Sequence, residues 1–174
     1  MKSPSEILLG GLFIALALAL PIAFHLVGLG SSFLPMFFPI ILAGYLLPVR
    51  ASLVVGLTSP LISALLTGMP PLYPPIAFIM MGEALALVII PYFFYQKLKM
   101  NIWCSLVLTI AGERVVLLLS IILISKWLKL PGVVLGISSL LKGLPGIILT
   151  FLVIPPLVIN LKRRIMISPF FNQE

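Results

Sequence analysis

The acid Glu83 stands inside an apolar run that follows a proline-rich stretch from Thr67 to Pro75. A charged side chain at the centre of a membrane helix costs about 3 kcal/mol or more, so such residues commonly serve a function. The prolines exclude a helix interior, because each one removes an N–H donor and clashes with the preceding turn. This order predicts a structured outer loop that leads into a helix with a buried acid, as in a small-molecule site.

Two further charged residues, Glu113 and Arg114, lie within a later apolar run. At 1.5 Å per residue, Glu83 lies about 12 Å below the outer end of its helix, a depth that the Arg114 side chain can reach. Neighbouring side chains point about 100° apart on a helix, so Glu113 and Arg114 are expected not to share a face. Two interpretations stay open: these groups contact a ligand, or they form a structural ion pair.

Other candidate ligand-binding residues lie on the outer side of the chain. Tyr73, between prolines, suits stacking on a planar ligand at low entropic cost. His25 together with methionines such as Met36 and Met69 would suit a soft metal. Methionine is, however, a common apolar filler, so we expect His25 to form hydrogen bonds and predict neither a metal nor a cofactor.

The composition places the chain in a membrane. Of its 174 residues, 61% are hydrophobic and 9% are charged, whereas a soluble domain carries about 25% charged residues. The sequence therefore predicts an all-α integral membrane protein, a single transmembrane domain (1–174) built as a compact bundle of about six helices. We predict these helices at residues 7–27, 34–47, 51–66, 75–95, 102–125 and 143–161. A re-entrant pair in place of the second and third helices is the alternative.

The net charge of +7 is explained by orientation in the membrane, and no nucleic-acid partner is expected. With the N-terminus inside, seven basic residues fall on the inner side and three on the outer side. The inner set is Lys2, Arg50, Lys97, Lys99, Lys162, Arg163 and Arg164, and the outer set is Lys126, Lys129 and Lys142. The positive-inside rule thus predicts cytoplasmic N- and C-termini in a multi-pass protein of the cell membrane.

Gly11, Ala15 and Ala19 recur every four residues on the first predicted helix. Such a stripe lets another helix approach closely, and it serves either docking onto another subunit or packing inside this bundle. The chain carries no Walker lysine motif, G-x-S-x-G, H-E-x-x-H or CxxC. We therefore expect no catalytic residues, and the protein is not expected to be an enzyme.

Taken together, these features resemble the S component of energy-coupling factor (ECF) transporters, the substrate-binding membrane subunit of a class of prokaryotic vitamin importers. The likeness covers nearly the whole chain and includes six short helices and the pair Ala15 and Ala19. The similar segments are Leu42–Leu46, Thr67–Pro71, Met80–Ala84, Gly143–Ile147 and Ile154–Pro156.

The resemblance implies that the chain captures a vitamin or related micronutrient from outside, for ATP-driven uptake through a transmembrane coupling subunit and two ATPase subunits. Ala15 and Ala19 would contact the coupling subunit. The ligand would lie near Met69, Tyr73, Glu83 and Arg114, with Met36 and His25 at the rim. Two alternatives stay open: a stand-alone ion-coupled secondary transporter that uses Glu83, and a structural subunit of a membrane complex without a ligand.

Overall fold

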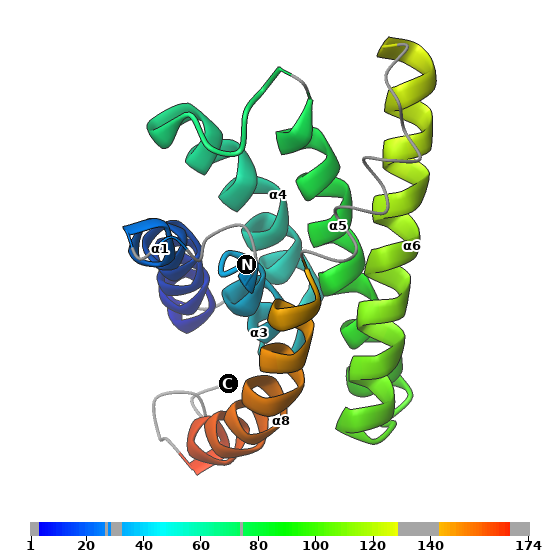
Figure 1. Ribbon diagram of the computed structural model, residues 1–174. Coiled ribbons are helices and arrows are strands. Elements are labelled where there is room, and N and C mark those ends of the chain that lie inside the picture. The colour runs from blue at the N-terminus through cyan, green and yellow to red at the C-terminus, as the bar shows by residue number, and fades with distance from the viewer. Residues whose placement is uncertain (1–3, 27, 29–32, 74, 129–142, 168–174) are drawn as a thin grey trace.

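The computed structural model describes residues 4–26, 28, 33–73, 75–128 and 143–167. Within these ranges the chain forms six helices and no strand, which confirms the prediction of an all-α bundle (Figure 1). The helices are α1 (Pro4–Leu26), α3 (Phe37–Leu46), α4 (Val49–Thr67), α5 (Ile76–Pro91), α6 (Ile102–Leu128) and α8 (Leu144–Ile167). A π-helical segment, η1 (Tyr92–Lys97), continues α5 without a break.

Five of these helices are long and apolar enough to cross a membrane: α1, α4, α5 together with η1, α6 and α8. A span needs about 20 apolar residues. The second and third predicted helices differ in kind. α4 has 19 residues and can span alone, whereas α3 has only ten.

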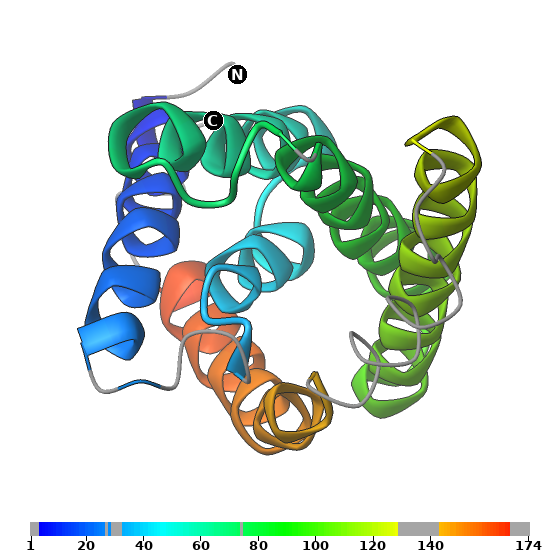
Figure 2. The same ribbon diagram turned by 45° about the horizontal axis from the view of Figure 1, so that its top comes forward.

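The short helix α3 lies at the centre of the bundle, where α1, α4, α5 and α8 all pack against it (Figure 2). Eight of its ten residues are buried. Gly44 permits the closest approach, because a Cβ atom at this position would lie 2.7 Å from the carbonyl oxygen of Leu87 on α5. The side chain of Gln96 donates to the carbonyl oxygens of Gly44 (2.7 Å) and Leu47 (2.9 Å), which caps the end of α3. The neighbouring helices therefore surround α3, so it lies inside the protein and not against lipid.

A buried row of polar side chains on α6 faces this central helix. Ser105 and Thr109 are fully buried, and the hydroxyl of Tyr45 on α3 donates to the Ser105 hydroxyl at 3.2 Å. Thr109 in turn donates to the carbonyl oxygen of Ser105 at 2.7 Å, a common way to satisfy a hydroxyl inside a helix. The same face of α6 continues one turn later to Glu113.

The two ends of the bundle differ in chemistry. At one end, the ammonium group of Lys162 near the end of α8 lies 4.7 Å from the ring centroid of Tyr95 in η1, beside the turn between α3 and α4 that Gln96 caps. At the other end, the last turn of α1 meets residues 34–36, the end of α4 and the start of α5. The candidate ligand site is built at this second end.

Candidate functional site

The proline-rich loop after α4 is held by hydroxyl groups of the helix that precedes it. Gly68 ends α4 in the left-handed conformation, with φ of 71°, which glycine adopts without steric cost. The Ser63 hydroxyl then donates to the carbonyl oxygen of Met69 at 2.6 Å. The Thr67 hydroxyl accepts from the Met69 N–H at 3.2 Å and donates to the Ser63 carbonyl oxygen at 2.8 Å. The loop is thus structured at its start, as the sequence predicts.

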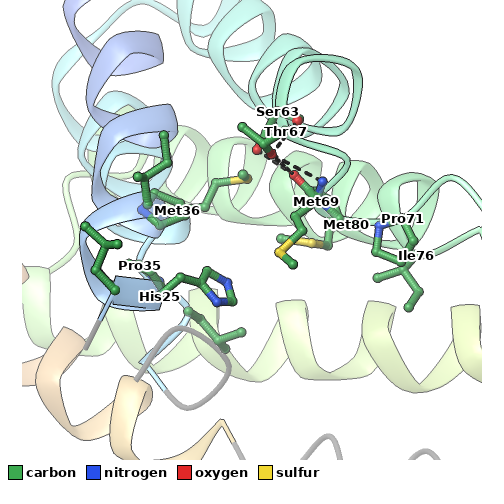
Figure 3. A pocket seen from close by; sticks show the side chains of 14 residues that line it. His25, Pro35, Met36, Ser63, Thr67, Met69, Pro71, Ile76 and Met80 are labelled. Atoms are coloured by element: carbon green, nitrogen blue, oxygen red, sulfur yellow. Dashed lines mark hydrogen bonds between the residues drawn. The ribbon is translucent and has the colours of Figure 1, made fainter. Parts of the chain in front are cut away.

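This loop covers one side of a pocket of about 550 Å³ (Figure 3). The volume lies within the range of ~300–1,000 Å³ that is usual for small-molecule sites. The lining of this pocket comes from the end of α1, residues 34–36, α4, the loop and α5. Three of the predicted ligand-binding residues line the pocket, namely His25, Met36 and Met69. Most of the lining is apolar, and the polar side chains in it are His25, Ser63 and Thr67.

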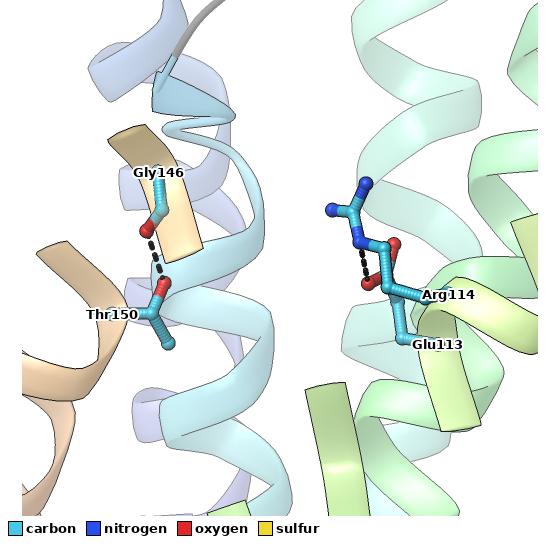
Figure 4. A network of polar contacts seen from close by, with 4 residues as sticks. All are labelled: Glu113, Arg114, Gly146 and Thr150. Carbon is cyan, nitrogen blue, oxygen red and sulfur yellow. Dashed lines mark hydrogen bonds and ion pairs between the residues drawn. The ribbon is translucent and has the colours of Figure 1, made fainter. Parts of the chain in front are cut away.

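A second group of predicted residues forms an ionic cluster between α5 and α6, which we define as Glu83, Glu113 and Arg114. Glu83 and Glu113 are only 4% and 1% exposed, and the Arg114 side chain is 15% exposed. The Nε atom of Arg114 lies 2.8 Å from Oε2 of Glu113 (Figure 4). The expectation that these neighbours do not share a face therefore did not exclude a contact, because a long arginine side chain reaches across the 100° between adjacent positions.

Glu83 joins this cluster from the neighbouring helix. α5 packs against α6, and the Glu83 and Glu113 carboxyl groups lie close enough to interact electrostatically with each other and with Arg114. The depth of these residues along their helices allowed a direct pair between Glu83 and Arg114. The structure instead joins all three groups in one cluster, in which Arg114 forms an ion pair with Glu113.

Leu34 connects the ionic cluster to the pocket. It lines the pocket, and a Cβ atom at Gly143 would lie 3.4 Å from Leu34 Cδ1 and 3.0 Å from Arg114 Nη1. Leu34 has a φ of 48°, a left-handed conformation that is uncommon outside glycine and often marks functional sites. Met80 gives a second connection, because it lines the pocket one helical turn before Glu83.

Tyr73 is the predicted ligand contact that lies in neither group. Its side chain is 81% exposed, and it is not part of the pocket lining. A role for Tyr73 in ligand binding stays a prediction.

The pocket also contains residues that the sequence pattern did not assign to ligand binding, among them Ser63, Thr67 and Met80. Ser63 and Thr67 are polar residues spaced four apart in the last turns of α4, so they lie on the same face. That spacing was the one signal that could have found them. Leu34 gave none, because its role depends on contacts with residues far away in the chain.

The small-residue stripe on α1 faces away from the bundle. Gly11, Ala15 and Ala19 are all exposed, whereas Phe13 and Ala17 form the buried face of the helix. A Cβ atom at Gly11 would meet no atom within 4 Å. Packing inside this bundle therefore does not explain the stripe.

The helices define a multi-pass membrane protein, with a pocket of ligand size and a buried ionic cluster near one end of the bundle. Residues 6–158, which are most of the chain, match the family described as "ECF transporter, substrate-specific component". The chain therefore belongs to the family of substrate-specific S components of ECF transporters. None of the curated proteins and none of the solved structures matches it significantly.

Proposed function

We propose that this S component captures a vitamin or related micronutrient from outside a prokaryotic cell and delivers it by ATP-driven uptake through partner subunits. The pocket at the end of α1 carries this proposal, since its volume of about 550 Å³ fits ligands of that size. Apolar walls with few polar groups are typical of small-molecule sites. Contacts from the ionic cluster and from Tyr73 would add to the ligand's binding.

The partners in this proposal are a transmembrane coupling subunit and two ATPase subunits. The exposed stripe of Gly11, Ala15 and Ala19 supports a docking role for α1, because small residues let two helix backbones approach closely in lipid. α1 is also the least buried of the five spanning helices, with 17% of its most apolar window buried. A large lipid-facing surface is thus free for another membrane subunit.

The proposed orientation has both termini in the cytoplasm of a cell-membrane protein. Lys97 and Lys162 lie at the bundle end opposite the pocket. Basic residues concentrate on the cytoplasmic side of membrane proteins, so the pocket end would face outward. The loop from Thr67 to Tyr73 would then act as a lid over a ligand that arrives from outside.

The experiment that tests this function is transport into vesicles. The chain is reconstituted with and without an ECF module, after native mass spectrometry of the purified protein identifies the co-purifying small molecule. We expect uptake of that compound to require both the module and ATP. Uptake by the chain alone that collapses with an uncoupler would instead support a secondary transporter. Absence of both a ligand and uptake would support a structural subunit.

A further inference from the structure

The charges of the ionic cluster do not balance. Two carboxyl groups, Glu83 and Glu113, share one guanidinium, that of Arg114. Within the described part of the chain, no other cationic side chain acts on either acid. With both acids ionised, the cluster holds one negative charge in excess. A buried charge without a partner is strongly unfavourable, so either a proton held between the two acids or a further positive group must balance the cluster.

One carboxyl group also has an unused acceptor. Glu113 is 1% exposed, and among the described residues its Oε1 atom accepts no hydrogen bond while its Oε2 atom has only the ion pair with Arg114. Buried carboxylate oxygens normally accept at least one hydrogen bond. The unused acceptor therefore lies on the same group whose charge is only partly compensated.

The orientation of Arg114 explains why it neither balances the charge of both acids nor donates to Oε1 of Glu113. Its Nε atom faces Oε2 of Glu113, while its two Nη atoms are directed away from that carboxylate (Figure 4). They lie against Gly143 instead, where a Cβ atom would be 3.0 Å from Nη1 and 3.3 Å from Nη2. Only one of the three guanidinium nitrogens, Nε, therefore contacts a carboxylate.

From these observations we infer that the site takes a ligand with a cationic nitrogen, such as a protonated amine or a charged heteroaromatic ring, which binds beside the carboxyl groups of Glu83 and Glu113. The inference rests on the proposed function and names the ligand class for the same site. The pocket would hold the ligand's apolar part, with Leu34 and Met80 bordering both regions. The rival explanation is a proton held between the two acids, with no ligand contact.

Three matched probes separate these possibilities: 3-phenylpropylamine, 3-phenylpropan-1-ol and 3-phenylpropionate, which are cationic, neutral and anionic at pH 7. Each is titrated into the purified full-length protein while its thermal unfolding is followed. We expect the amine to stabilise the wild type, and the alcohol and the acid to have little effect. Absence of stabilisation by the amine, or equal stabilisation by the alcohol or acid, would overturn the inference.

Glu113→Gln keeps the shape of the side chain and removes its charge. We expect it to weaken binding of the amine about tenfold or more, since a charge-assisted hydrogen bond contributes about 1.5–3 kcal/mol. Glu6→Gln makes the same change outside the cluster and should bind like the wild type. Should Glu113→Gln fail to fold, Glu83→Gln provides the same comparison. Wild-type affinity in a folded cluster variant would support the shared proton and reject the cationic ligand.

The outcome of the transport experiment keeps the two proposals apart. A neutral or anionic micronutrient that is taken up with the ECF module and ATP would leave the proposed function intact and reject the cationic ligand class. Absence of any ligand and of any uptake would reject both.

Discussion

The Nε atom of Arg114 lies 2.8 Å from Oε2 of Glu113, the residue that precedes it in the chain. Adjacent residues on a helix rarely pair in this way, because their side chains leave the helix about 100° apart. Here Glu83 on α5 approaches the same carboxyl group. Arg114 therefore acts on acids from two helices at once, so its removal should affect the whole α5–α6 interface.

Arg114→Leu should destabilise the protein, because it leaves two acids in the bundle without a counter-charge. Breaking a buried ion pair from one side typically costs about 3–5 kcal/mol. Thermal unfolding of the purified protein measures the effect. Arg163→Leu, on the exposed surface of α8, is the control and should unfold close to the wild type. Equal unfolding temperatures for both variants would show that the acids need no counter-charge in the folded state.

Gly146→Ala should shift the segment that borders the pocket. A Cβ atom at this position would lie 2.7 Å from the carbonyl oxygen of Phe33, and such overpacking typically costs about 1–3 kcal/mol. Gly82→Ala is the matched control, since its Cβ atom would come no closer than 3.6 Å to Val116 Cγ1. We expect a lower unfolding temperature for Gly146→Ala alone. A loss of similar size in the control would point to a general intolerance of larger residues at helical glycines.

Ala15→Leu combined with Ala19→Leu should abolish ATP-driven uptake while ligand binding persists. The two leucines would fill the exposed stripe on α1 and keep a partner helix from approaching closely. Binding to the purified chain and uptake with the ECF module are measured in parallel. Ala111→Leu places the same bulk on an exposed position of α6 and should preserve uptake. Loss of ligand affinity in the double variant would contradict the assignment of this surface to a partner.

Ser63→Ala should loosen the start of the proline-rich loop, because it removes the hydroxyl that donates to the Met69 carbonyl oxygen at 2.6 Å. Such a hydrogen bond contributes about 1 kcal/mol, so amide exchange at residues 67–69 should quicken about fivefold where local opening controls it. Hydrogen–deuterium exchange with mass spectrometry reports this directly. Ser59→Ala, also buried, removes only a bond to Val55 within α4. Unchanged exchange in Ser63→Ala would mean that other contacts hold the loop.

The sequence was sufficient for much of the architecture. Lipid demands long apolar helices whose backbone groups bond internally, so composition and run length alone predict a six-helix membrane bundle. The prolines between Thr67 and Pro75 exclude a helix there, and the position of Glu83 and Arg114 deep within apolar runs marks both residues as unusual. These predictions depend on local chemistry, which a single segment carries by itself.

The tertiary structure decided which of these residues meet. It separated His25, Met36 and Met69, which line the pocket, from Glu83 and Arg114, which join Glu113 in the ionic cluster. It also placed the small-residue stripe that includes Gly11 on the exposed face of α1. In a membrane, both lipid-facing and core-facing positions are apolar, so the sequence of α1 has no amphipathic pattern that distinguishes its two faces. Only the packing of helices distant in the chain fixes that rotation, and with it the site.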